Sequence, residues 1–129
     1  MTTTFKDLGL STSTVLQLEQ LGFTDPTQIQ QDAVPALLQG KDIVGQSQTG
    51  TGKTAAFALP ALELVDADNK AVQALILTPT RELAQQVGEA INDFSSKERR
   101  VFSLTVYGGQ SIERQISRLR RGVQIVVGT

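Results

Sequence analysis

The chain has 129 residues, of which 40% are hydrophobic and 19% charged, and its 12 basic residues nearly balance 13 acidic ones. This composition is typical of a folded domain and excludes a wholly disordered chain. Because the net charge is near zero, any binding to nucleic acid would need locally placed charge. The absence of Cys and His excludes thiol chemistry, disulfides, the usual structural zinc sites and imidazole-dependent triads. No apolar stretch could span a bilayer and no secretory signal is visible, so we expect a cytoplasmic protein without membrane partners.

Two helices are predicted in the first forty residues. Apolar side chains recur at helical spacing over residues 13–21. Pro26 and Thr27 then introduce a second helix, which Pro35 should bend and Gly40 should end.

From residue 42 onward, predicted strands alternate with predicted helices. The helices cover residues 53–65, with a bend at Pro60, then residues 80–94 and the region around residues 112–121. The predicted strands cover residues 42–47, 72–78, 101–107 and 123–127. The second of these, VQALILT, is almost continuously apolar, as expected for a strand buried on both faces. This alternation predicts an α/β fold, in which helices lie on the faces of a parallel sheet.

The segment from Ser47 to Thr54, SQTGTGKT, lies between a predicted strand and a predicted helix. Its glycines allow backbone amides to approach phosphate oxygens, and the following helix turns its positive end toward the anion. Lys53 supplies a charge for the β and γ phosphates, and the hydroxyl of Thr54 suits Mg²⁺. The alternative is a polar glycine-rich turn, which the coincidence of strand, loop, Gly-Lys-Thr and helix disfavours.

Three further segments each allow a structural and a functional interpretation. In GFTDPTQIQ, residues 22–30, Thr27 and Gln30 have the spacing of a capping box. Residues 79–83, PTREL, form either a capped turn or a phosphate site at the carboxyl end of a strand. Residues 107–110, YGGQ, form either a turn or a place where a ligand approaches the backbone. Three arginines share one face of the last predicted helix, a pattern that is usually a solvated surface: Arg114, Arg118 and Arg121.

Taken together, these segments resemble one family, the DEAD-box RNA helicases. GFTDPTQIQ is similar to the family's Q motif, and SQTGTGKT to motif I, with Ser47 where the family usually has Ala. PTRELA is similar to motif Ia, residues 108–109 to the GG motif, and residues 128–129 to the start of motif Ib. Phe5 stands where the family has an isolated upstream aromatic residue. The resemblance extends over essentially the whole chain.

The resemblance implies an incomplete P-loop NTPase fold of the RecA-like type, with helices on both faces of a parallel sheet. Residues 1–40 would form the Q-motif helical region, and residues 41–129 a partial RecA-like ATP-binding helicase domain. The family's Asp-Glu-Ala-Asp motif and second RecA-like domain would follow Thr129. We therefore expect a fragment of an ATP-dependent RNA helicase that neither hydrolyses ATP nor unwinds RNA alone.

The resemblance also implies ATP and Mg²⁺ as cofactors, with Lys53 and Thr54 as catalytic residues and Thr54 as the Mg²⁺ ligand. The implied ATP-binding residues are Phe5, Phe23, Thr27, Gln30, Ser47, Gln48, Thr49, Gly50, Thr51, Gly52, Lys53 and Thr54. The implied RNA contacts, made to the backbone and independent of base sequence, are Pro79, Thr80, Arg81, Gly108, Gly109 and Thr129. Two alternatives stay open: a P-loop NTPase without an RNA substrate, and a non-catalytic nucleotide-binding truncation.

Overall fold

The computed structural model describes residues 3–48, 50 and 52–129. The chain divides into two compact units, one extending up to Leu64 and the other running from Val65 to Thr129. The sequence-based boundary between residues 40 and 41 separates the Q-motif region from the rest of the helicase domain. It does not describe a division into compact units, and it stays a prediction.

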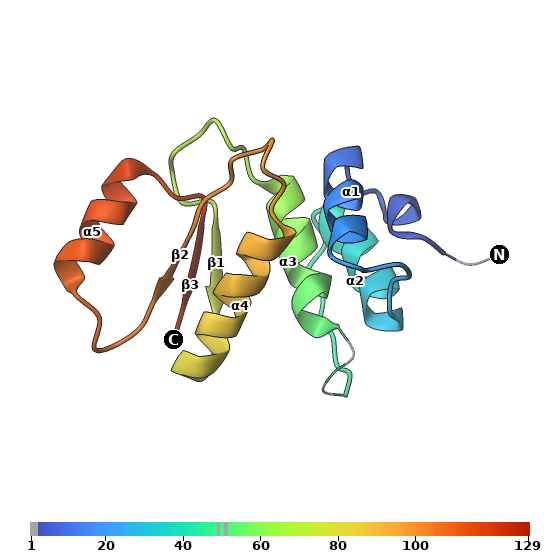
Figure 1. The fold of residues 1–129 in the computed structure, drawn as a ribbon. Helices are drawn as coiled ribbons and strands as arrows, with labels where there is room; N and C mark the ends of the chain where they lie inside the picture. Colours follow the sequence, from blue (N-terminus) through green and yellow to red (C-terminus); the bar gives the residue numbers. More distant parts are fainter. Residues whose placement is uncertain (1–2, 49, 51) are drawn as a thin grey trace. The chain divides into compact units, whose positions relative to one another are not determined.

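The first unit is helical (Figure 1). Its elements are the 3-10 helix η1 (Phe5–Leu8) and the helices α1 (Thr12–Gln20), α2 (Gln28–Leu38) and α3 (Lys53–Leu64). The three α-helices lie where the apolar periodicity predicts them, and α2 and α3 each continue past an internal proline. Across the described parts of the chain, no helix is both long enough and apolar enough to cross a membrane.

The strand predicted over residues 42–47 is wrong, because this segment has no regular secondary structure. A strand requires a neighbour that pairs with its backbone. The described sheet consists of three strands that all belong to the second unit. Without a partner, the segment's apolar side chains stay open to solvent, and Val44 is 93% exposed.

The second unit contains a three-stranded parallel sheet, which confirms the predicted sheet type. The strands β1 (Ala74–Leu77), β2 (Ser103–Val106) and β3 (Ile125–Gly128) lie in the order β1-β3-β2. They are in register, since Gly128 at the end of β3 pairs with Leu77 on one side and Val106 on the other. The three strands therefore end at the same edge.

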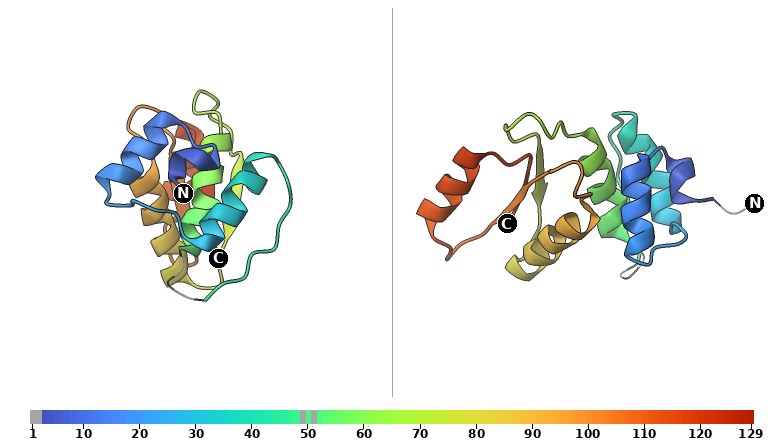
Figure 2. Two further views of the ribbon diagram at one scale, coloured as in Figure 1. Left: turned by 90° about the vertical axis from the view of Figure 1, so that its right-hand side faces the viewer. Right: turned by 45° about the horizontal axis from the view of Figure 1, so that its top comes forward.

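Two helices connect these strands, and they lie on opposite sides of the sheet (Figures 1 and 2). The connection through α4 (Arg81–Phe94) passes over β3 to reach β2, and the connection through α5 (Ile112–Arg121) returns to β3. Right-handed crossovers in opposite directions place their helices on opposite faces. The buried stripe of α4 contains Ala84, Val87, Ile91 and Phe94, whereas α5 has no buried residue.

The expectation that β1 is buried on both faces is wrong for the described residues. Leu75 and Leu77 are 63% and 72% exposed. They point to the same face of the strand, and α5, the helix on the side opposite α4, contacts β2 rather than β1. One face of β1 is therefore open.

Gln124 ties the amino ends of the strands together. The side chain is only 2% exposed, and its Oε1 accepts a hydrogen bond from the backbone N–H of Phe102 at 2.8 Å. Its Nε2 donates to the carbonyl oxygens of Ala67, at 3.3 Å, and Asn69, at 3.0 Å. One carboxamide thus holds the segment before β1 and the segment before β2 against the start of β3.

We predict that Gln124→Leu lowers the free energy of unfolding by about 3 kcal/mol, since it removes three buried hydrogen bonds that contribute roughly 1 kcal/mol each. Urea unfolding followed by circular dichroism measures this change. Gln115→Leu is the matched control, because among the described residues the Gln115 side chain forms a single hydrogen bond, donated to Gln110 five positions earlier. Equal losses in the two variants would contradict a special role for Gln124.

Candidate functional site

Two glycines of the loop before α3 have backbone conformations that favour glycine. Gly50 and Gly52 have φ angles of 81° and 87°, in the left-handed region that favours glycine. A Cβ at Gly52 would overlap the side-chain amide of Gln30. Thr49 and Thr51 lie outside the described residues.

Lys53 and Thr54 begin α3 directly after this loop. The Lys53 ammonium donates a hydrogen bond to the carbonyl oxygen of Ser47 at 2.5 Å, so its side chain lies across the loop. Thr54 is half-buried in the first turn, and Gln48 is exposed. Unpaired amides at a helix amino terminus next to a lysine form a site suited to phosphate.

The Q-motif segment contacts the same loop. Thr27 is the N-cap of α2, and its backbone N–H donates to Oε1 of Gln30 at 3.0 Å. Nε2 of Gln30 donates to the carbonyl oxygen of Gly52 at 3.2 Å, and the side chain is 2% exposed. Gln30 therefore caps the helix and also contacts the glycine-rich loop. The two interpretations of this segment are compatible.

The hydroxyl of Thr27 fits a site that awaits a polar ligand. Its oxygen is buried and has no hydrogen-bond partner among the described residues. A Cβ at Gly52 would lie 3.1 Å from it, so the hydroxyl lies beside the loop. Buried polar groups are normally paired, so the unpaired Thr27 hydroxyl is an exception among the described residues.

The two predicted aromatic residues differ in accessibility. Phe5 lies in η1 and is 3% exposed, whereas Phe23 is 38% exposed. In the turn that contains Phe5, the carboxylate of Asp7 accepts hydrogen bonds from the backbone N–H of Thr4, at 2.8 Å, and from the Thr4 hydroxyl, at 2.9 Å. These bonds, led by the backbone one, lower the pKa of Asp7 below its ordinary value. Phe23 is thus the more accessible of the two rings.

The predicted RNA-binding residues come together at one edge of the sheet. Residues 79–81 follow β1, residues 108–109 follow β2 and Thr129 follows β3. Because the strands are parallel and in register, these three loops share the carboxyl edge (Figure 1). Ligands bind at this edge in open α/β sheets. The structure therefore gathers residues that are far apart in the sequence.

Arg81 is held in place at this edge. Its guanidinium lies 5.1 Å from the centre of the Tyr107 ring, and its Nη2 donates to the carbonyl oxygen of Gly108 at 3.3 Å. The Tyr107 hydroxyl accepts a hydrogen bond from Nε2 of Gln85 at 2.8 Å. Gly109 has a φ of 91°, and a Cβ there would lie 3.6 Å from the Arg81 Nη2. A cation is thereby fixed beside two exposed glycines.

Tyr107 and Gln85 are not among the predicted site residues. The sequence does offer a signal for both, because Tyr107 is the one tyrosine of the chain and directly precedes Gly108-Gly109. Gln85 stands one helical turn after Arg81, on the same side of α4. The hydrogen bond between Gln85 in α4 and Tyr107 after β2 could not be predicted from the spacing of these residues in the sequence.

Thr80 already has a structural role. Its hydroxyl accepts a hydrogen bond from the backbone N–H of Leu83 at 3.1 Å and so caps α4. Pro79, Thr80 and Thr129 are exposed. The capped-turn interpretation of residues 79–83 therefore holds. Within this segment, Arg81 carries the charged group that contacts Gly108 at the carboxyl edge of the sheet.

Comparison with known proteins gives concordant results. A family model described as DEAD/DEAH box helicase matches residues 27–129. The chain is 65% identical to the RNA helicase CrhR of Synechocystis sp. over 129 residues, which are 100% of this chain and 26% of that protein. It is 53% identical to the DEAD-box ATP-dependent RNA helicase CshA of Bacillus cereus, over 98% of this chain and 24% of that protein.

A solved structure is similar as well. The crystal structure of a DEAD box protein from the hyperthermophile Methanococcus jannaschii matches with a TM-score of 0.91 and 42% sequence identity, over 98% of this chain and 34% of that chain. The chain spans about a quarter of the length of the curated relatives it matches. Since the family model covers most of the sequence, the chain belongs to the DEAD/DEAH box helicase family.

Proposed function

We propose that the chain carries the nucleotide-binding loop and part of the RNA-binding edge of an ATP-dependent RNA helicase. The observation that carries this proposal is the left-handed glycine loop that leads into Lys53 and Thr54 at the start of α3. The names of two relatives, both RNA helicases, support the RNA substrate. The Arg81 edge of the sheet supplies a place for RNA.

Lys53 would bind the β and γ phosphates of ATP, together with amides of the loop and of the first turn of α3. The hydroxyl of Thr54 would hold Mg²⁺, which when bound neutralises charge on those phosphates. Among the described residues, no group of three or more His, Cys, Asp or Glu side chains could hold a metal ion. Mg²⁺ bound through Thr54 and the phosphates would keep water molecules as its remaining ligands.

Gln30 would recognise adenine. Its carboxamide keeps a spare N–H and a spare lone pair beyond the bonds to Gly52 and Thr27. Adenine offers a matching acceptor at N7 and donor at its 6-amino group. Because the side chain is 2% exposed, adenine would reach these spare groups only after neighbouring residues move.

Arg81 would bind RNA phosphate at the carboxyl edge, where Gly108 and Gly109 leave room for a backbone to approach. Residue Thr129 lies at the same edge after β3. Such contacts position an RNA strand and read no base sequence.

We predict that Lys53→Ala weakens ATP binding at least tenfold, since a charge-assisted hydrogen bond contributes roughly 1.5–3 kcal/mol. Titration of a fluorescent ATP analogue with Mg²⁺ measures the affinity. Lys41→Ala, at an exposed lysine before the loop, is the matched control and should bind as the wild type does. Equal affinity of Lys53→Ala and wild type would remove Lys53 from the site.

We predict that the wild type prefers ATP to GTP and that Gln30→Glu loses this preference. Guanine has acceptors at both positions facing the carboxamide, so one group stays unsatisfied at a cost of about 1–3 kcal/mol. Gln31→Glu is the matched control, because its Nε2 also donates to a backbone carbonyl, that of Pro26, at 3.0 Å. If Gln30→Glu lowers the melting temperature but keeps the base preference, its role is capping alone.

We predict that Arg81→Ala weakens RNA binding equally for all base sequences and lowers the slope of log affinity against log salt by about 0.7. Tyr107→Leu should weaken binding roughly two- to fivefold, because the ring contributes about 0.5–1 kcal/mol to holding the cation. Tyr107→Phe keeps the ring and should bind nearly as the wild type does.

Fluorescence anisotropy with labelled RNAs of different base composition measures these effects. In a variant that already lacks the Arg81 guanidinium, Tyr107→Leu should cause no further loss. A loss confined to some base sequences would mean that Arg81 reads bases rather than phosphate.

A further inference from the structure

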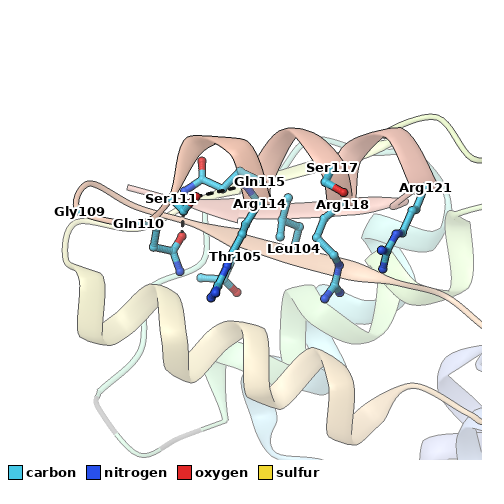
Figure 3. A pocket seen from close by; sticks show the side chains of 10 residues that line it. All are labelled: Leu104, Thr105, Gly109, Gln110, Ser111, Arg114, Gln115, Ser117, Arg118 and Arg121. Atoms are coloured by element: carbon cyan, nitrogen blue, oxygen red, sulfur yellow. Dashed lines mark hydrogen bonds between the residues drawn. The ribbon is translucent and has the colours of Figure 1, made fainter.

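A cavity of about 600 Å³ lies between α5 and β2 in the second unit. Figure 3 shows the side chains of three arginines of α5, Arg114, Arg118 and Arg121, extending from the helix into this cavity. The rest of its lining is polar except for one strand leucine and one glycine: Leu104, Thr105, Gly109, Gln110, Ser111, Gln115 and Ser117. None of the described residues that line the cavity carries a carboxylate.

Within the described part of the chain, the guanidinium groups of these three arginines have no protein partner. No side chain among the described residues forms a hydrogen bond or ion pair with the guanidinium of Arg114, Arg118 or Arg121. The helix as a whole carries four arginines and one glutamate. A local excess of positive charge therefore exists in a chain whose net charge is −1.

The orientation of α5 is unlike that of an ordinary surface helix. Such a helix buries its apolar face and turns its charged face to water. Here the arginine face lies toward β2, while Ile112, Ile116 and Leu119 on the other face are 69%, 44% and 41% exposed. The arginines are exposed as well, and their face of the helix lines a hollow beside the sheet.

A second hollow of about 260 Å³ adjoins the first and shares two of its arginines, Arg118 and Arg121. It is completed by Phe102, Gly122 and Val123, and Phe102 is 53% exposed. An accessible aromatic ring next to unpaired guanidinium groups is the combination that binds single-stranded nucleic acid, in which bases stack on rings and phosphates contact cations.

The larger cavity begins at the candidate RNA edge. Gly109, which neighbours the Arg81 guanidinium, also lines this cavity together with Gln110 and Ser111. From there the arginines extend over seven residues of helix, a rise of about 10 Å. The cavity with the three arginines of α5 therefore starts at a glycine that neighbours Arg81.

We propose that single-stranded RNA continues from the carboxyl edge of the sheet along the arginine face of α5, where its phosphates contact Arg118 and Arg121 and one base stacks on Phe102. This inference rests on the proposed RNA-binding function and extends it to a surface outside the family's motifs quoted above. The contacts are independent of base sequence, since they involve phosphates and a ring face.

The test uses the 129-residue chain and a fluorescein-labelled oligouridine of about 15 nucleotides, together with one of about 5 nucleotides. The double variant Arg118→Gln/Arg121→Gln should weaken binding of the long probe at least tenfold. Its salt slope between about 50 and 200 mM should fall by about 1.4, or 0.7 for each lost phosphate contact. The short probe, which Arg81 and the glycine edge can hold, should bind as before.

Arg120→Gln is the matched control, because Arg120 lies on the same helix and lines neither hollow. It should lower affinity for the long probe less than twofold. If Arg120→Gln weakens binding as much as either single variant, Arg118→Gln or Arg121→Gln, the effect is one of general charge and the proposed path is wrong.

Variants of Phe102 test base stacking independently of the arginines. Phe102→Tyr keeps an aromatic ring and should bind the long probe normally, whereas Phe102→Leu keeps an apolar side chain and should bind it roughly tenfold more weakly. Circular dichroism melts check that every variant is folded. Equal binding of Phe102→Leu and Phe102→Tyr would exclude base stacking at this ring.

The outcomes separate this inference from the proposed function. If Arg81→Ala weakens both probes while Arg118→Gln/Arg121→Gln changes neither, the edge binds RNA and the α5 path is overturned. If the wild type binds neither probe at low salt, or Arg81→Ala changes neither affinity, the proposed RNA edge itself fails.

Discussion

The pairing of β3 with β1 on one side and β2 on the other is the constraint on which the candidate RNA site depends. Parallel strands in register end together, so three loops that are distant in the sequence meet at one edge. The pairing is close at that end, because a Cβ at Gly128 would lie 3.0 Å from Cγ2 of Val106. Arg81 reaches Gly108, 27 positions away, only because of this alignment.

In the first unit, one buried carboxamide has a comparable role. Gln30 bonds to the start of α2 and to the carbonyl of Gly52, so the Q-motif helix and the glycine loop have a common anchor. In the proposed function, this same carboxamide would also recognise adenine. If that proposal holds, binding of the base and the position of the glycine loop would depend on a single side chain.

The sequence predicts most of the elements, because their apolar periodicity is strong, as over residues 83–94 and 123–127. It fails where structure depends on a partner: residues 42–47 have the composition of a strand but no paired neighbour in the described sheet. For the site, the glycines and Lys53 follow from local spacing. The contact between Arg81 and Tyr107 does not, since it arises from strand register, and the exposed arginine face of α5 depends on how the helix is rotated against the sheet.

The central claim is that the glycine loop binds nucleotide and the carboxyl edge of the sheet binds RNA. Amide chemical shifts of the ¹⁵N-labelled chain, recorded during separate titrations with a non-hydrolysable ATP analogue plus Mg²⁺ and with oligouridine, test it most directly. The account predicts that the nucleotide shifts amides of residues 47–54 and Gln30, and that RNA shifts those of Arg81, Gly108 and Gly109. It would be contradicted if the nucleotide left residues 47–54 unchanged, or if RNA left the carboxyl edge unchanged while shifting amides elsewhere.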